Sequence, residues 1–125
     1  MYVDTNIIID FLREKEVAKK FFERKPGSLR TSVIVKLELI DGLQTRREIL
    51  NLNKRVFNKL NIENIPINDE ISGKTEEIFT EFRHSHGISI NDSIIAATAL
   101  VYDEELVTKN TKHFDFVPNL RLLEP

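Results

Sequence analysis

The sequence contains no cysteine. Disulfide bonds and thiolate metal sites are therefore excluded, and oxygen and imidazole groups remain as the available ligands for a metal ion. Long apolar runs are also missing, since no stretch approaches the roughly 20 apolar residues that a membrane-spanning helix needs. A basic leader followed by an apolar stretch and a cleavage site is absent as well. We therefore expect a cytoplasmic protein without a membrane segment.

An excess of positive charge is missing too. The formal net charge is −2 and the isoelectric point is near 5.9, which argues against a protein that coats nucleic acid through bulk electrostatics. Any contact with nucleic acid must come from a local basic patch. A chain of 125 residues is long enough for one hydrophobic core and too short for two ordinary domains. We expect one domain spanning residues 1–125.

Short apolar strands alternate with helices along the chain. The patterns predict strands at residues 2–3, 29–31, 62–67, 105–108 and 120–123, and helices over 7–12, 14–24, 33–43, 45–60, 69–86 and 88–101. A turn at Pro26 and Gly27 should end the second helix. Pro66 removes a donor from the third strand, which favours an edge position. The alternation is typical of βαβ units in a parallel sheet, so we predict an α/β fold.

Two acids fall at positions that suggest a site. Asp4 lies at the carboxyl end of the first strand, which is the edge where open α/β sheets bind ligands. Capping of the next helix by Asp4 or Thr5 explains the same residues about equally well. Glu38 lies between Leu37 and Leu39 in a helix that is apolar almost all round. Because an unpaired buried carboxylate is costly, Glu38 should face a cleft, although a place on a surface stripe remains an alternative.

Two further polar residues extend this pattern. Asp92 lies in the first turn of the most apolar helix, where a capping box that begins at Ser89 is the alternative explanation. Asn110 follows the fourth strand, just as Asp4 follows the first. Several acids without cysteine indicate a hard-oxygen site suited to Mg²⁺ or Mn²⁺. Clustered carboxylates repel one another, so without a cation at least one of them should tend to protonate.

Four segments together resemble the motifs of the PIN-domain nucleases, and in particular the VapC-type toxins of toxin–antitoxin systems. The segments are, in order, Val3-Asp4-Thr5-Asn6, then residues 32–39, 90–99 and 106–114. The resemblance implies a five-stranded parallel sheet between helices, hence a three-layer α/β/α sandwich. It also implies an endoribonuclease that depends on magnesium or manganese, a homodimer, and neutralisation by a cognate antitoxin protein.

The resemblance assigns metal-binding acids to Asp4, Glu38 and Asp92, and a supporting polar role to Asn6. The sequence departs from the family at the fourth acid, where it offers Asn110 and His113, with Asp115 just beyond. The departure leaves open whether the site holds one metal ion or two. It also leaves open an alternative function, a weakly active or inactive PIN-like module that binds RNA or a protein.

The implied mechanism is hydrolysis of RNA phosphodiester bonds by a metal-activated water. Asn110 and Thr108 would orient a water or a phosphate. The candidate RNA-binding cations are Lys36, Arg46, Arg47, Lys109 and Lys112, although an ordinary solvated surface explains each of them as well. Three histidines are present, but no two of them form an evident acid–base pair, so we expect a mechanism that depends on metal.

Overall fold

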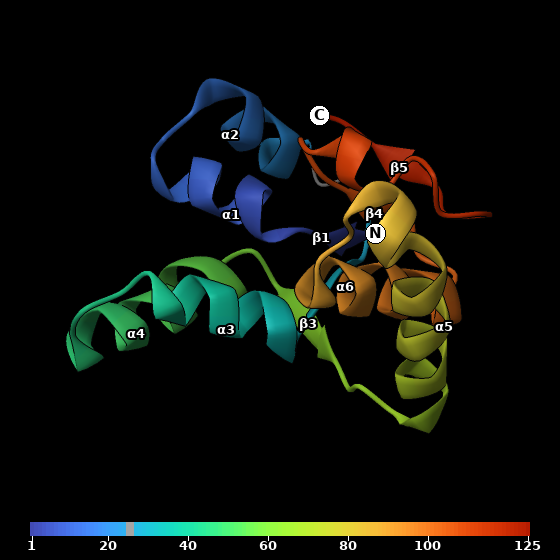
Figure 1. Cartoon of the computed structure of the whole chain (residues 1–125). Helices are drawn as coiled ribbons and strands as arrows, with labels where there is room; N and C mark the ends of the chain where they lie inside the picture. Colours follow the sequence, from blue (N-terminus) through green and yellow to red (C-terminus); the bar gives the residue numbers. More distant parts are fainter. Residues whose placement is uncertain (25–26) are drawn as a thin grey trace.

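The computed structural model describes residues 1–24 and 27–125, and a five-stranded sheet runs through its centre (Figure 1). The elements in chain order are β1 (Tyr2–Val3), α1 (Thr5–Leu12), α2 (Glu16–Glu23), β2 (Leu29–Ser32), α3 (Val33–Asp41), α4 (Arg46–Leu52), η1 (Asn53–Asn58), β3 (Ile62–Ile65), α5 (Asp69–His86), α6 (Ile90–Val101), β4 (Leu106–Val107), η2 (Thr111–His113) and β5 (Leu122–Leu123).

All neighbouring strands pair in parallel, in the order β3-β2-β1-β4-β5. β1 lies in the middle, and its residues Tyr2 and Val3 are completely buried. The chain adds β2 and β3 on one side of β1 and then crosses to add β4 and β5 on the other. Such a reversal creates a crevice at the carboxyl ends of the strands. In this fold the crevice lies where β1 and β4 end.

Helices cover both faces of the sheet, which confirms the predicted three-layer α/β/α sandwich. α6 packs against α5 and α3, and α1 packs against α2 and α3. Ala96, Ala97 and Ala99 of α6 are fully buried, because their small side chains let neighbouring elements approach closely. None of the helices in the described ranges is long and apolar enough to span a membrane.

The predicted elements are present, with differences at their ends. β3 is an edge strand as expected, and it stops at Ile65 before Pro66. The helix expected over 45–60 is divided into α4 and the π-helix η1. The expected turn at Pro26 and Gly27 lies partly outside the described residues, because Pro26 is not among them.

α3 also differs from the prediction. Its apolar residues do not bury the helix on all sides, since Val33 and Leu37 are 43% and 53% exposed. Ser32 takes the N-cap position without making a capping hydrogen bond. Its hydroxyl instead lies 2.6 Å from the hydroxyl of Tyr2. This contact links the end of β2 to the central strand.

Candidate functional site

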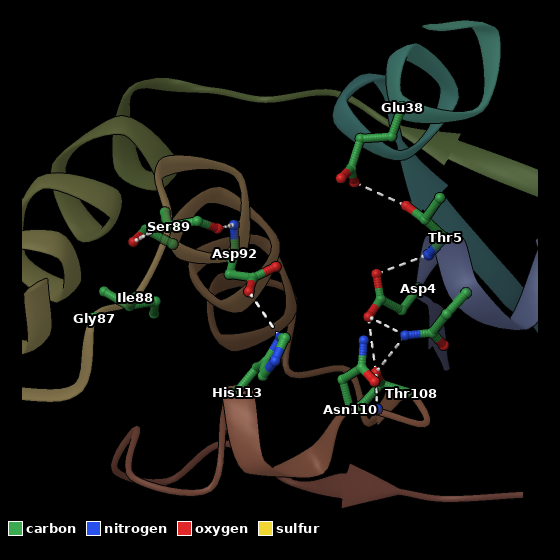
Figure 2. A network of polar contacts seen from close by, with 12 residues as sticks. Asp4, Thr5, Glu38, Gly87, Ile88, Ser89, Asp92, Thr108, Asn110 and His113 are labelled. Atoms are coloured by element: carbon green, nitrogen blue, oxygen red, sulfur yellow. Dashed lines mark hydrogen bonds and ion pairs between the residues drawn. The ribbon is translucent and has the colours of Figure 1, made fainter. Parts of the chain in front are cut away.

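Asp4 follows β1 directly and lies at the crevice between β1 and β4. The residue is almost fully buried, at 6% exposed. Oδ1 accepts a hydrogen bond from the backbone N–H of Thr5 at 2.7 Å, and Oδ2 accepts one from the hydroxyl of Thr108 at 2.8 Å (Figure 2). The amide of Asn6 donates to the same Oδ2 at 3.2 Å. Asp4 therefore caps α1, which was the alternative explanation from the sequence. Two of the three hydrogen bonds that its carboxylate accepts, those from Asn6 and Thr108, are not part of the cap.

Asn6 and Thr108 hold this carboxylate from two segments far apart in the sequence. Val3 and Val107 are paired in register, so Asp4 and Thr108 leave neighbouring strands side by side. The amide nitrogen of Asn6 donates to the Thr108 hydroxyl at 3.1 Å, and its amide oxygen accepts the backbone N–H of Lys109 at 3.1 Å. The structure thus brings both predicted supporting residues into direct contact with Asp4.

Glu38 comes from α3 and is half-buried. Its Oε1 accepts a hydrogen bond from the hydroxyl of Thr5 at 2.8 Å. Figure 2 shows the carboxylate turned toward the start of α1, where Asp4 lies. Its intermediate burial is compatible with the predicted site and also with the alternative of a partly exposed stripe that includes Lys36 and Asp41.

Asp92 comes from the first turn of α6. The Ser89 hydroxyl accepts the backbone N–H of Asp92 at 3.0 Å, which confirms the predicted helix cap. The Asp92 side chain is turned toward His113 instead, with Oδ2 lying 3.4 Å from Nδ1 of the imidazole (Figure 2). Ser89 thus serves as the cap, and the carboxylate of Asp92 is directed toward η2.

The three carboxylates influence one another electrostatically. Burial raises the pKa of Asp4 from its ordinary 3.8 to about 6, against the lowering effect of its hydrogen bonds to Thr108 and Thr5. The charges of Asp92 and Glu38 raise it further. Burial also raises the pKa of Asp92, as does the charge of Glu38, while His113 lowers it. Like charges that are partly withdrawn from water favour either protonation or a nearby cation.

The carboxylates of Asp4, Glu38 and Asp92 face the same space from β1, α3 and α6 (Figure 2). Over residues 1–24 and 27–125, no three or more acidic, histidine or cysteine side chains form a group that could hold a metal ion as they stand. The arrangement is therefore an open set of oxygen donors. Asp4 and Glu38 accept hydrogen bonds and Asp92 contacts His113, and because a carboxylate offers about four acceptor positions, these contacts leave others for a ligand.

Asn110 follows the same strand end as Thr108. Its backbone N–H donates to the Thr108 hydroxyl at 3.1 Å, and Figure 2 shows its side chain beside Thr108 and Asp4. The residue is exposed. The structure therefore brings Asn110 to the site, together with the acids.

The five basic candidates are not gathered in one place. Lys112 is exposed in η2, next to His113, whereas the Nζ atom of Lys109 lies 2.6 Å from Oδ2 of Asp10. Lys36 is half-buried, with Nζ 4.6 Å from the centroid of the Phe57 ring. Arg46 and Arg47 are exposed at the start of α4, which lies at the end of the α3–α4 pair away from β4 (Figure 1).

Three residues of this network were missed or undervalued from the sequence. Thr5 was considered as a cap, but its hydroxyl holds Glu38. Asp10 pairs with Lys109 although it is 8% exposed. An acid within the apolar run 7–12 is the same signal that drew attention to Glu38, so Asp10 could have been found. The contact of His113 with Asp92 spans two elements and had no comparable signal.

Comparisons with known proteins agree with this fold. A sequence model of the PIN domain matches residues 1–119. Ribonuclease VapC10 of Mycobacterium tuberculosis is 33% identical over 124 residues, covering 95% of this chain and 89% of that protein. The structure of VapBC2 from Rickettsia felis bound to a DNA fragment of its promoter has a TM-score of 0.81 at 25% identity, covering 98% of this chain and 96% of that chain. A toxin–antitoxin complex from Klebsiella pneumoniae has a TM-score of 0.75 at 28% identity, covering 99% and 96%. The resemblance noted in the sequence is confirmed, and the chain belongs to the PIN domain family.

Proposed function

We propose that this protein is a metal-dependent endoribonuclease, the toxin of a type II toxin–antitoxin pair. The observation that carries the proposal is the set of three carboxylates that face one space at the crevice between β1 and β4. The name of the Mycobacterium tuberculosis relative, a VapC ribonuclease, supports the reaction. The descriptions of the Rickettsia felis and Klebsiella pneumoniae structures support an antitoxin as partner.

The donors fit Mg²⁺ or Mn²⁺. Asp4, Glu38 and Asp92 offer oxygen atoms, which hard divalent cations prefer. Burial is the main cause of the raised pKa of Asp4, and the charges of Asp92 and Glu38 add to it, so a nearby cation would favour the ionised form of this carboxylate. Mg²⁺ keeps several of its waters when it binds to proteins, so an incomplete set of protein ligands is sufficient. We assign Asp4, Glu38 and Asp92 as the residues that hold the ion.

A bound ion would lower the pKa of a water and offset the charge that develops on the phosphate oxygens. The residues of the chain hold the carboxylates in position. Asn6, Thr108 and the Thr5 N–H hold Asp4 in one orientation, and the Thr5 hydroxyl holds Glu38. Glu38 would accept a proton from the attacking water. Asn110 would orient a water or a phosphate without adding charge.

The products follow from this assignment. A histidine pair could instead activate the ribose 2′-hydroxyl and leave a cyclic phosphate, but His84 and His86 are exposed at the end of α5 and His113 comes from η2. Attack by water with the 3′ oxygen as leaving group gives 5′-phosphate and 3′-hydroxyl ends. EDTA should stop cleavage, and the double variant His84→Ala/His86→Ala should retain it. Cyclic phosphates formed in EDTA would contradict the mechanism.

RNA would approach along the exposed edge that carries η2. Lys112 lies there without an ion-pair partner among the described residues, whereas Lys109 is engaged by Asp10. Lys36, Arg46 and Arg47 are candidates that would extend the contact along α3 and α4. Each phosphate contact steepens the dependence of affinity on salt. Lys112→Ala should therefore reduce both the affinity for RNA and its salt dependence more than Arg46→Ala or Arg47→Ala does.

A non-catalytic module that binds RNA or protein is the second candidate. It is favoured by Asn110 in place of a fourth acid, and by the finding that no three or more acidic, histidine or cysteine side chains among residues 1–24 and 27–125 form a group that could hold a metal ion. Calorimetric titration with Mn²⁺ separates the two functions. Binding that is lost in Asp4→Asn supports the nuclease, while no heat at millimolar Mn²⁺ supports the module.

The protein partners need a separate test. We propose one cognate antitoxin and a homodimer, and the antitoxin should be encoded in the neighbouring reading frame. Co-expression with that product should yield a stable complex that no longer cleaves RNA. Analytical ultracentrifugation of the free protein measures its oligomeric state, and a single monomeric species at micromolar concentration would contradict the dimer.

A further inference from the structure

We infer that Phe82, His86 and Phe116 form a platform on which a base of single-stranded RNA stacks beside the candidate site. We call these three residues the aromatic cluster. The inference rests on the proposed function, because it concerns the RNA that the protein binds. It requires no metal ion, since stacking adds affinity whether or not the RNA is then cleaved.

The rings of the aromatic cluster contact one another near the protein surface. The imidazole of His86 stacks on Phe116, with the ring centroids 4.2 Å apart and the planes 15° from parallel. Phe82, one turn earlier on α5, packs against His86 and Phe116 at centroid distances of 5.7 Å and 5.2 Å. His86 is exposed and the two phenylalanines are half-buried. A further ring can therefore reach the stack from solvent, and RNA-binding proteins hold unpaired bases by stacking them on aromatic and histidine side chains.

Several contacts hold the imidazole in place before any RNA binds. The Ser85 hydroxyl lies 2.8 Å from Nδ1 of His86. Gly87 ends α5 in the left-handed conformation with a φ of 69°, and the Arg83 guanidinium donates to the carbonyl of Ile88 at 3.1 Å. A surface that is already ordered loses little conformational freedom when a ligand binds. The cluster is therefore suited to hold a base at a low entropic cost.

The chain places the cluster next to the candidate site. Nδ1 of His113 lies 3.4 Å from Oδ2 of Asp92. Phe116 follows His113 by three residues, and three extended residues span at most about 11 Å. Figure 2 shows the segment from Gly87 to Ser89 leading from α5 to the first turn of α6, which carries Asp92. The same two segments of the chain thus meet once at the candidate site and once at the cluster, so RNA bound at the carboxylates can reach the rings with a base only a few positions away.

Electrostatic attraction alone is a weak source of RNA affinity in this protein. The formal net charge is −2, Nζ of Lys109 is paired with Asp10, and Nζ of Lys36 lies over the Phe57 ring. Stacking on an aromatic side chain needs no net charge, and it can act on every base because every base has a π-face. The cluster therefore supplies an affinity for single strands that these basic residues do not.

A structural role and a phosphate contact are the two competing explanations. The rings could serve only to cover the core at the end of α5, in which case RNA affinity would not depend on them. His86 could instead contact a phosphate as a cation, in which case lysine would replace it and phenylalanine would not. Stacking predicts the reverse order, because it depends on the ring and not on the charge.

The test is binding of a fluorescently labelled single-stranded RNA to the full-length protein in EDTA, which prevents metal-dependent cleavage. His86→Ala should weaken binding by about 5-fold or more, the factor expected for the loss of one stacked base. His86→Phe should stay within about 2-fold of the wild type, whereas His86→Lys should lose as much as the alanine variant. His84→Ala removes another exposed imidazole of α5, outside the cluster, and is the matched control. Urea denaturation checks that each variant is folded, and His86→Gln replaces the alanine variant if that variant is not.

The cluster binds RNA and takes no part in breaking the phosphodiester bond. With metal present, the double variant His84→Ala/His86→Ala should therefore still cleave saturating RNA, and its loss should appear as a higher KM.

An abasic scan locates the stacked base. Removing the bases of the RNA one at a time should identify a position where the wild-type protein loses about as much affinity as it does in His86→Ala. The same removal should have little further effect in His86→Ala, because the two changes delete one interaction.

Each outcome decides between the explanations. Weaker binding in His86→Ala and His86→Lys, with His86→Phe close to the wild type, supports the inference. Unchanged RNA affinity in His86→Ala, or a loss in His86→Phe that His86→Lys avoids, would overturn it while the proposed function stands. Unchanged RNA affinity together with a weaker complex with the antitoxin would also overturn it and would assign the cluster to a protein interface. If the wild-type protein binds no RNA, the proposed function fails and the inference fails with it.

Discussion

The ammonium group of Lys109 lies 2.6 Å from Oδ2 of Asp10, and the two residues come from segments on either side of the sheet crevice. Asn6 and Asp10 are one turn apart on the same face of α1. Asn6 holds the backbone N–H of Lys109, and Asp10 holds its side chain. One face of α1 therefore fixes both ends of the residue that leads from Thr108 to Asn110.

This pair should respond unequally to the removal of its two members. Lys109→Met leaves the nearly buried carboxylate of Asp10 without a partner, which should lower the free energy of unfolding by about 1–3 kcal/mol. Asp10→Asn leaves an ammonium that is already half-exposed and can turn to water, so its cost should stay below about 1 kcal/mol. Urea denaturation measures both values, with Lys109→Arg as the conservative control. Equal losses would contradict the expected asymmetry, and a change in RNA affinity without a loss of stability in Lys109→Met would show that Lys109 acts as a free cation.

The carboxylates of Asp4 and Asp92 should lower the stability of the metal-free protein, although cleavage requires them. Asp4→Asn and Asp92→Asn should abolish cleavage and leave stability without metal at pH 8 equal or higher, since each removes a carboxylate that repels its neighbours. For Asp4 the gain in the free energy of unfolding cannot exceed about 3 kcal/mol, which is the free-energy equivalent of its pKa shift. The gain should be smaller than that, because asparagine also disturbs the hydrogen bonds to Asn6 and Thr108. Cleavage assays and urea denaturation in EDTA measure the two effects. Full activity with a large loss of stability in Asp92→Asn would mean that the Asp92 carboxylate acts only in the structure, through its contact with His113.

The raised pKa of Asp4 predicts an unusual dependence of stability on pH. Between its ordinary value of 3.8 and the folded value of about 6, the native protein binds more protons than the unfolded chain. The free energy of unfolding should therefore fall as the pH rises through this window, by roughly 3 kcal/mol from this group alone. Denaturation curves in EDTA from pH 4 to pH 8 measure the fall, and Asp4→Asn should lack that share of it. Saturating Mn²⁺ should restore stability at pH 8, since a ligand that binds only the folded state stabilises it. An identical pH profile in Asp4→Asn would assign the effect to other groups.

Asn110 provides a test of the fourth position. If its side chain reaches the ion with a neutral oxygen, Asn110→Asp should tighten Mg²⁺ and Mn²⁺ binding by adding a charge at the same place. Calorimetry measures the two affinities, and Asp115→Asn serves as a control because Asp115 is exposed beyond the buried Phe114. Unchanged affinity in Asn110→Asp would place Asn110 outside the reach of the ion.

The sequence predicted those site residues whose chemistry and whose position after a strand both point to the same edge of the sheet. A carboxylate directly after a buried parallel strand must lie at the ligand-binding edge, and this argument located Asp4 and the segment around Thr108 and Asn110. The same reasoning could not reveal the bond from Thr5 to Glu38 or the contact between His113 and Asp92. These contacts join helices whose relative placement depends on the packing of the whole core.

The differences between the predicted and the observed helices have specific physical causes. The apolar spacing over 45–60 is compatible with both an α-helix and a π-helix, so the change at Asn53 leaves no mark in the pattern. Ser32 is an ordinary N-cap by sequence, but its hydroxyl is engaged by Tyr2, which lies 30 residues earlier. The capping propensity of serine reflects only its neighbours along the chain, and the tertiary contact with Tyr2 overrides it.

The strand order also has a consequence for biosynthesis. Thr108 lies 104 residues after the carboxylate that it holds, and the two meet only when β4 pairs with β1 in the completed sheet. A nascent chain that has not yet emerged past residue 108 exposes Asp4 without this partner and lacks His113 altogether. Contacts of such long sequence separation form late and slowly in folding. The set of contacts around Asp4 can therefore be completed only after the chain has been translated beyond Thr108.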